Sequence, residues 1–269
     1  MTPRVVRADA KKQTISHEDF LAIKQAATGL VPAAAYRLLL DGTLREIASM
    51  TRGRRVGYAW SGGKDSQALE VVMQLAGVED CCFGMTNLEY VAFLTWVTNH
   101  MPAGLQVYNN GWDLDWLRNH EAWIFPQTAA AASRWFNGVQ RKAQAQFSAA
   151  NGIELLIHGG RACDGNYVGD GAGVFMGAEG VLRYAPLRHW SHADVFACLH
   201  YAGVEEEPPF YRWPRGYRCG THPWPARQWC RTRDDGYAEV YAIEPALIRE
   251  AAAAGIASAR TFLARTGRL

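Results

Sequence analysis

The sequence has little of several features that would narrow its class at once. Its formal net charge is only +2 over 269 residues, so no global positive field points to nucleic acid, although a local basic patch stays open. No apolar stretch approaches the length of a membrane span, and residues 1–13 are too polar for a signal peptide. The six cysteines are scattered through a chain too large to need disulfides in order to fold. We therefore expect a soluble cytoplasmic protein without a membrane partner.

What is present is an alternation of apolar runs and helical patterns. With 49% hydrophobic and 20% charged residues, the composition is that of an ordinary globular protein. The alternation predicts an α/β fold, an open and mostly parallel sheet flanked by helices, with helical additions at both ends. Predicted strands cover 56–60, 80–85, 104–108 and 153–158, and predicted helices cover 66–76, 88–100, 114–119, 129–150 and 192–201.

Three regions follow from this pattern. Residues 1–50 are expected to be an N-terminal helical extension, 51–233 the α/β domain, and 234–269 a C-terminal helical segment broken near Gly255. Within the middle region, the glycine-rich stretch 164–180 predicts an irregular loop, and 205–224, rich in proline, glycine and aromatic residues, predicts a long loop.

The segment Ser61–Ser66 reads Ser-Gly-Gly-Lys-Asp-Ser, directly after the apolar run Val56–Trp60 and directly before a helical pattern. Gly62 and Gly63 let the backbone turn sharply and bring its N–H groups close to an anion, and the following helix points its positive end at the same place. This is not a Walker A loop, because Tyr58 stands where that motif needs its first glycine. The segment predicts a phosphate-binding loop at the carboxyl edge of the sheet.

These six residues resemble the pyrophosphate-binding loop of the PP-loop ATP pyrophosphatases, or adenine nucleotide alpha hydrolases. Later segments make the chain similar to the phosphoadenosine phosphosulfate (PAPS) reductase-like branch, over about residues 55–219. The segments that carry this similarity are Thr86–Glu89, Ser133–Phe136 with Arg141 and Lys142, His158–Asp164, and Tyr184–Leu187 with Trp190, Asp194 and Val195. Two positions depart from it, since Phe136 stands in place of a cysteine and Val168 where relatives often have arginine.

The resemblance implies a nucleotide-binding domain that binds ATP with Mg²⁺ and cleaves it to AMP and pyrophosphate, so that an unknown acceptor in sulfur or nucleotide-modification metabolism is adenylated. It implies catalytic roles for Lys64, Asp65, Arg161 and Cys219, with Asp65 as a Mg²⁺ ligand. Lys142 is an alternative to Arg134 for neutralising phosphate oxygens. The expected nucleotide-binding residues are Ser61, Gly62, Gly63, Lys64, Asp65, Ser66, Thr86, Arg134, Gly160 and Arg161.

Two rival functions stay open. The segment Cys219-Gly220-Thr221-His222 resembles the Cys-Gly-x-His tail of sulfonucleotide reductases, which implies a nucleophilic thiolate at Cys219. Against this, that tail ends its chains, whereas residues 220–269 follow here, and such reductases usually lack the intact loop. The other rival is a nucleotide-binding subunit that needs a partner enzyme, and a homo-oligomer is also open.

Cysteine spacing bears on metals and clusters. Because only Cys219 and Cys230 lie close together and Phe136 replaces a further ligand, we do not expect an iron–sulfur cluster. A zinc site from Cys219, His222 and Cys230 would need a fourth ligand, so a structural loop cysteine is the favoured interpretation of Cys219. The adjacent Cys81 and Cys82 fall in an apolar strand and are expected to be buried.

Six of the ten tryptophans form two groups. Trp112, Trp116 and Trp123 have near-helical spacing and are expected in the core. Aromatic residues and arginines alternate in the long loop, which is compatible with a clamp on a nucleotide or single strand and equally with a lid packed on itself. The members of this second group are Trp213, Trp224 and Trp229, with Arg212, Arg215, Arg218 and Arg227.

Overall fold

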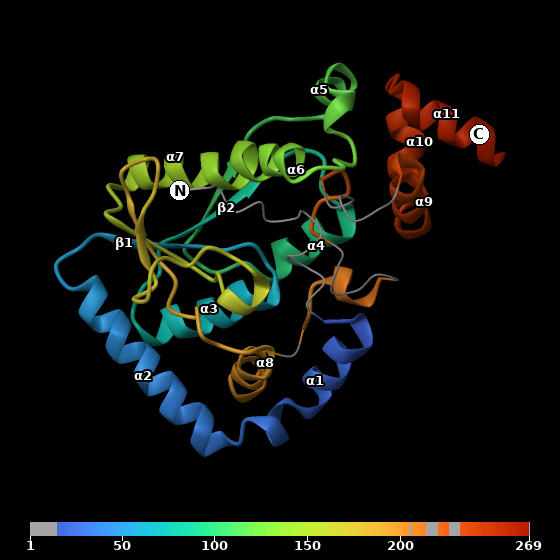
Figure 1. Ribbon diagram of the computed structural model, residues 1–269. Helices are drawn as coiled ribbons and strands as arrows, with labels where there is room; N and C mark the ends of the chain where they lie inside the picture. The colour runs from blue at the N-terminus through green and yellow to red at the C-terminus, as the bar shows by residue number, and fades with distance from the viewer. Residues whose placement is uncertain (1–14, 205, 214–219, 226–231, 269) are drawn as a thin grey trace.

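A single six-stranded sheet organises the computed structural model, which describes residues 15–204, 206–213, 220–225 and 232–268 (Figure 1). The strand order is β3-β2-β1-β4-β6-β5. Every neighbouring pair is parallel except β5 with β6, which is antiparallel. The strands are β1 (Val56–Ala59), β2 (Cys81–Met85), β3 (Leu105–Asn109), β4 (Leu155–His158), β5 (Val174–Met176) and β6 (Leu182–Tyr184).

The order of the strands contains a reversal beside β1. The chain runs outward from β1 to β2 and β3, and then returns to place β4 on the other side of β1, where Ala59 is paired with His158. In open parallel sheets a ligand crevice lies outside the carboxyl ends of the strands at such a reversal. The predicted fold class is therefore confirmed, and the segment after β1 lies where that crevice is expected.

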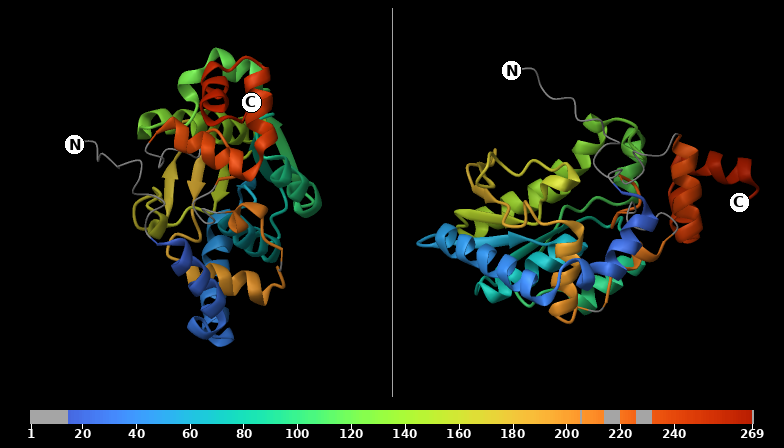
Figure 2. Two further views of the ribbon diagram at one scale, coloured as in Figure 1. Left: turned by 90° about the vertical axis from the view of Figure 1, so that its right-hand side faces the viewer. Right: turned by 60° about the horizontal axis from the view of Figure 1, so that its bottom comes forward.

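Helices cover both faces of the sheet. In Figure 1, α7 lies on one face, while α3 and α8 lie on the other with α1 and α2 outside them, and the turned views agree (Figure 2). The α-helices are α1 (His17–Leu30), α2 (Ala33–Thr51), α3 (Lys64–Leu75), α4 (Val91–His100), α5 (Leu114–Asn119), α6 (Ala129–Phe136), α7 (Lys142–Asn151), α8 (His192–Tyr201), α9 (Arg233–Ile243), α10 (Pro245–Ala253) and α11 (Ala257–Thr266). Shorter helical segments are η1 (Glu121–Trp123), η2 (Asn137–Arg141), η3 (Ala162–Asp164) and η4 (Pro209–Arg212).

The helices at the two ends of the chain have clear local causes. Ser16 and Asp19 form a capping box that starts α1, because the side chain of each residue accepts a hydrogen bond from the backbone N–H of the other. At the other end, α9, α10 and α11 gather at one side of the molecule (Figure 2). Glu121 attaches this group to the body by accepting from the N–H groups of Ala257 and Ser258 at the start of α11.

Several segments differ from their prediction. The expected helix 129–150 is three pieces, since η2 is a π-helical segment between α6 and α7. The region 164–180 includes strand β5, whose residues are too few to show a period-two pattern. The C-terminal helices break at Pro245 as well as near Gly255, because proline begins α10.

Of the expected core residues, the two cysteines are buried, whereas Trp112, Trp116 and Trp123 are partly buried and pack against the core. Cys81 and Cys82 are both buried in β2. The indole rings of Trp112 and Trp116 are stacked with centroids 4.1 Å apart, and Trp123 and Trp135 meet them edge to face. Of the second tryptophan group, Trp224 is fully buried against Phe125, so there the self-packed interpretation holds, while Trp229 lies outside the described residues. Among the described residues, no helix combines the length and apolar character that crossing a membrane requires.

Candidate functional site

The Ser61–Ser66 loop joins the carboxyl end of β1 to the start of α3. Gly62 has φ +72°, and a Cβ there would lie 2.9 Å from the Trp96 ring, so both conformation and space require glycine. Ser66 is drawn into the loop, since its hydroxyl donates to the Gly63 carbonyl at 2.9 Å. Among the described residues, nothing accepts a hydrogen bond from the N–H groups of Gly62 and Gly63. The loop therefore keeps backbone donors available for an anion.

The helix after the loop begins without a side-chain cap. Gly63 is its N-cap residue, and the 12 residues of α3 follow from Lys64. The Lys64 N–H donates instead to the hydroxyl of Tyr211 in η4, at 2.9 Å. This contact brings the long loop after α8 against the positive end of α3, where an anion is favoured.

Lys64, Asp65 and Arg161 form a compact ion-pair group beneath the loop. The Asp65 carboxylate accepts from Lys64 Nζ at 2.7 Å and lies 2.8 Å from Arg161 Nε. The Lys64 side chain is 3% exposed and that of Arg161 is fully buried. Burial by itself would raise the pKa of Asp65, but the charges of Lys64 and Arg161 outweigh it and lower that pKa below its usual value. Asp65 is therefore a carboxylate that holds two cations in place.

Arg161 makes its other contacts deeper in the protein. Its Nη2 atom lies 2.7 Å from Asp164 Oδ2 and 3.2 Å from His192 Nδ1, and its Nη1 atom donates to the Trp190 carbonyl at 3.1 Å. Burial, followed by the charges of Lys64 and Arg161, lowers the pKa of His192 to about 4. His192 is thus neutral at pH 7 and can accept from Arg161.

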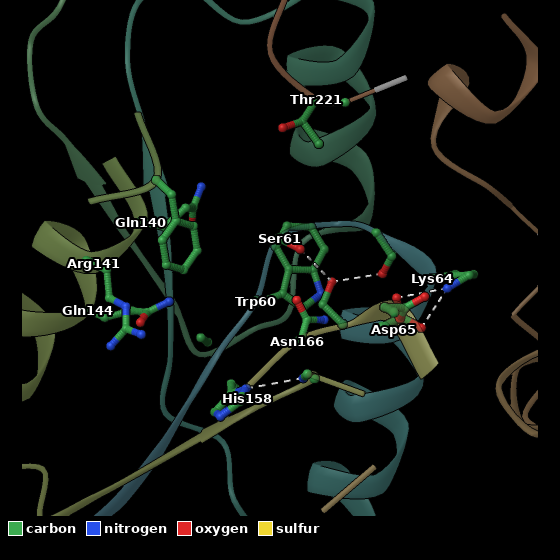
Figure 3. A pocket seen from close by; sticks show the side chains of 18 of the residues that line it. Trp60, Ser61, Lys64, Asp65, Gln140, Arg141, Gln144, His158, Asn166 and Thr221 are labelled. Carbon is green, nitrogen blue, oxygen red and sulfur yellow. Dashed lines mark hydrogen bonds and ion pairs between the residues drawn. The ribbon is translucent and has the colours of Figure 1, made fainter. Parts of the chain in front are cut away.

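A cavity of about 590 Å³ opens above the loop. Figure 3 shows Lys64 and Asp65 on one side of it, Arg141 and Gln144 on the opposite side, and Thr221 above. The lining residues are Ala59, Trp60, Ser61, Gly63, Lys64, Asp65, Ser66, Phe136, Gln140, Arg141, Gln144, His158, Gly159, Gly160, Asp164, Asn166, Tyr167, Phe175, Arg183, Phe210, Tyr211, Gly220 and Thr221.

Most of the predicted nucleotide-binding residues meet at this cavity. Ser61, Gly63, Lys64, Asp65, Ser66 and Gly160 line it, and the buried Gly62 and Arg161 lie next to lining residues. Gly159 permits this convergence, since a Cβ there would lie 2.9 Å from the Asp65 carbonyl oxygen at the start of α3.

Other predicted site residues lie elsewhere. Thr86 is fully buried outside the lining, where its hydroxyl donates to Glu89 Oε2 at 2.8 Å and lies 3.0 Å from His222 Nε2. Arg134 is exposed, with its guanidinium 5.9 Å from the Trp123 ring centroid, and Lys142 is exposed as well; neither lines the cavity. Cys219, with Cys230, lies outside the described residues.

Several lining residues were not among the predicted site residues. Arg141 and Gln144 were hidden in a helix that reads as an even Ala-rich pattern, and the π segment decides which of its side chains face the cavity. His158 had a usable signal, because it is a polar residue ending the buried run Leu155–Ile157. Arg183 had a similar signal in β6, whereas nothing marked Tyr211 as a partner of the loop.

The carboxylates near the loop are already engaged. Asp65 accepts from Lys64 and Arg161, and Asp164 accepts from Arg161, so each carboxylate is already paired with a cation of the protein. Ligand atoms of Cys163, Asp164 and His192 lie within 4.8 Å of one another, but the guanidinium of Arg161 contacts two of these three residues. These donors favour a metal that arrives on substrate phosphates over one held by the protein.

Comparisons with known proteins concern the fold. No protein-family model matches the chain, and no curated protein matches its sequence. Among solved structures, the chain is similar to phosphoadenylyl-sulfate (PAPS) reductase from Candida auris at 14% identity and a TM-score of 0.47, over 70% of this chain and 88% of that one. It is also similar to the U34-tRNA thiolase NcsA from Methanococcus maripaludis at 14% identity and a TM-score of 0.44, over 85% and 80% of the two chains.

One expectation needs correction. The NcsA structure contains a [4Fe-4S] cluster, so the expectation that a cluster is absent, which rested on cysteine spacing alone, is withdrawn. The four cysteines among the described residues are Cys81, Cys82, Cys163 and Cys198, of which Cys163 is exposed. In its strand order the chain has the open, mostly parallel α/β sheet that was expected, and the Ser-Gly-Gly-Lys-Asp-Ser loop lies between β1 and α3.

Proposed function

We propose that this chain binds ATP on the Ser61–Ser66 loop and transfers its AMP to an acceptor. An oxygen of the acceptor forms a bond to the α-phosphorus, the bond from that phosphorus to the bridging oxygen breaks, and pyrophosphate leaves with the electron pair. One observation carries the proposal. The N–H groups of Gly62 and Gly63 have no acceptor among the described residues, and they lie at the start of a 12-residue helix. This helix start lies at the reversal of the sheet, beside a cavity of about 590 Å³.

The ion pairs suggest different roles for the two cations. The Lys64 side chain lines the cavity and its ammonium is a compact charge with three donors, so it can share a phosphate oxygen while it keeps Asp65. Arg161 is enclosed and pairs with two residues that line the cavity, Asp65 and Asp164. We therefore assign Lys64 to the phosphates and give Arg161 a positioning role, which it exerts by fixing Asp65 and hence Lys64.

Mg²⁺ enters this proposal as part of the substrate. Because Asp65 and Asp164 are committed to Arg161 and Lys64, the magnesium would be held by the triphosphate oxygens and water and would bind as Mg·ATP. No step is assigned to a metal held by the protein. Catalysis would come from positioning and from donors aimed at the leaving pyrophosphate.

The test separates binding from chemistry. Binding of α,β-methylene-ATP, measured by calorimetry, should be weakened at least tenfold by Lys64→Ala, because a charge-assisted contact is lost, and unchanged by Lys142→Ala, which removes an exposed lysine outside the cavity. With ATP, slow turnover to water as acceptor should release pyrophosphate and AMP. Release of ADP and phosphate, or equal nucleotide affinity in both variants, would contradict the proposal.

A sulfonucleotide reductase is the second candidate, and one observation favours it. Gly220 and Thr221, which directly follow Cys219 in the chain, line the cavity. Under this alternative, sulfite would be released from a phosphosulfate nucleotide with dithiothreitol as reductant, and Cys219→Ser would abolish the release. Pyrophosphate release that survives Cys219→Ser would support adenylation instead.

A further inference from the structure

Beyond the loop, the cavity is lined by a polar wall formed by Arg141, Gln144, His158 and Arg183. The four residues come from separate elements, η2, α7, β4 and β6. Figure 3 shows Arg141 and Gln144 side by side, across the cavity from Lys64 and Asp65. The phosphate loop therefore does not account for this wall, and its chemistry needs a separate explanation.

His158 presents an unused donor. The Gly160 N–H donates to His158 Nδ1 at 3.2 Å, so Nδ1 is an acceptor and the proton of the neutral ring is on Nε2. Burial, followed by the charges of Arg183 and Arg141, lowers the pKa of His158 to about 4, which keeps the ring neutral at pH 7. His158 Nε2 is itself buried and has no hydrogen-bond partner among the described residues. A buried donor without an acceptor costs free energy, and a bound acceptor would remove that cost.

Arg141 presents a positive charge that is in no contact ion pair among the described residues, although the charge of Glu179 acts on it from farther away. Among the described residues its guanidinium makes no hydrogen bond or ion pair, and its recorded contact is with the ring of Phe136, at 5.5 Å. Burial and the neighbouring charge of Arg183 lower the pKa of Arg141. A guanidinium whose charged form is disfavoured by burial and by a like charge is stabilised when an anion enters the cavity.

Arg183 supports the wall from behind. Its guanidinium pairs with Glu179, so the negative charge of Glu179 offsets one of the two positive charges of Arg141 and Arg183. Its Nη1 atom donates to Gln144 Oε1 at 2.7 Å. Because this bond fixes the amide oxygen of Gln144, the amide nitrogen is the atom that stays available as a donor. No described residue accepts a hydrogen bond from this nitrogen. The wall thus offers one net positive charge and N–H donors from Arg141, His158 and Gln144.

The backbone beneath Arg141 is a second, independent observation. Asn137–Arg141 is a π-helical segment inside an otherwise regular helix, and such segments occur frequently at functional sites. Gln140 holds it against the sheet, since its amide donates to the Gly84 carbonyl at 3.0 Å. The irregular turn is therefore tied down at the place where it brings Gln140 and Arg141 to the cavity.

We propose that the polar wall binds an oxyanionic group, a carboxylate or a phosphate, carried by the molecule that accepts AMP. The identity of that molecule as an acceptor rests on the proposed function, whereas the existence of an oxyanion site on the wall does not. The acceptor is thus a small acidic molecule, held by Arg141, His158 and Gln144 while its nucleophilic oxygen lies toward the α-phosphorus.

The test uses inorganic phosphate and acetate as probes on the full chain saturated with α,β-methylene-ATP and Mg²⁺. Occupying the loop first confines the probe to the rest of the cavity, and calorimetry reports its dissociation constant. Arg141→Gln and His158→Phe should each weaken probe binding by about tenfold or more, which is the loss of one charge-assisted or buried hydrogen bond. Lys142→Gln is the matched control, since it removes an adjacent but exposed positive charge outside the cavity and should leave the affinity unchanged.

Each outcome decides a separate point. If the probe binds equally well to all variants, or not at all to nucleotide-saturated wild type, the oxyanion site is wrong even when nucleotide binding is intact. If α,β-methylene-ATP fails to bind but phosphate still binds in an Arg141-dependent way, the proposed function fails and the oxyanion site survives. Another outcome is that adenosine 3′,5′-bisphosphate binds far more tightly than AMP, through a contact that Arg141→Gln removes, and displaces the probe. In that case the wall recognises a phosphate of the nucleotide itself, and the assignment of the wall to the acceptor is wrong. A preference for acetate over phosphate identifies the group as a carboxylate, and the reverse identifies a phosphate.

Discussion

Replacing Arg161 with glutamine should destabilise the protein more than any exposed charge change. Arg161 is fully buried, pairs with Asp65 at 2.8 Å and with Asp164 at 2.7 Å, and also donates to the Trp190 carbonyl. Removing one partner from a buried ion pair costs about 3–5 kcal/mol, because the remaining charge stays buried without compensation. Since the Asp65 side chain is 29% exposed and that of Asp164 is 13%, water relieves part of this cost, and we expect about 3 kcal/mol.

The cost should also depend on pH, with a definite sign. The pKa of Asp65 is lowered in the folded protein, so its ion pairs contribute stability above its unfolded value and lose it as pH falls through the folded pKa. The variant lacks the Arg161 part of that contribution. The difference in stability between wild type and variant should therefore be largest near pH 7.5 and should shrink as pH falls below about 4, the usual aspartate value.

Urea unfolding followed by tryptophan fluorescence measures this difference at pH 7.5 and at successively lower pH. Arg134→Gln is the control, because it makes the same substitution on an exposed helix surface and should change the free energy of unfolding by less than about 0.5 kcal/mol. A cost below about 1 kcal/mol for Arg161→Gln, or a cost that does not vary with pH, would refute the ion-pair account of this group.

Three further changes test other parts of the site. In thermal unfolding, Gly62→Ala should lower stability by about 1–2 kcal/mol more than Gly53→Ala. Both glycines have φ near +70°, but only at Gly62 would the added Cβ lie 2.9 Å from the Trp96 ring, so equal costs would show that this clash is unimportant. Wild-type stability should fall as pH drops from 6.5 to 4, because burial lowers the pKa of His222 to about 4, and His222→Gln should flatten that fall; an unchanged slope would contradict it. Tyr211→Phe should cost about 1 kcal/mol without nucleotide, as the Lys64 N–H loses its acceptor, and no loss in urea unfolding would mean that water replaces it.

The elements that could be predicted were those with a strong local signal. The apolar runs before Ser61 and before His158 are strands, and the helices expected over 66–76 and 192–201 are present as α3 and α8. Such features depend on a few neighbouring residues, so the order of residues along the chain is enough to identify them. The phosphate loop belongs to this class, because its glycines, its lysine and the helix start are adjacent.

The parts that could not be predicted depend on contacts between distant segments. Thr86 follows a strand that ends at the correct edge of the sheet, but Glu89 and His222 occupy its polar atoms and keep it from the cavity. Arg134 and Arg141 lie in the same predicted helix with similar surroundings in sequence, but Arg141 ends the π segment and lines the cavity, whereas Arg134 precedes that segment and is exposed. A helical pattern averaged over 22 residues, 129–150, conceals one irregular turn.

The π-helical segment Asn137–Arg141 also has a consequence for how the chain tolerates insertions and deletions. A wide turn holds one residue more than an α-helical turn, so deleting a single residue there would let α6 and α7 join as one regular helix. Each residue of an α-helix turns the chain by about 100°, and the deletion would therefore rotate α6 by roughly that angle relative to α7. Trp135, now 3% exposed within the tryptophan cluster, would leave its position while Gln144 kept its own. The extra residue sets the rotation of α6 relative to α7 about the helix axis, so that α6 packs against the tryptophans while α7 faces the cavity.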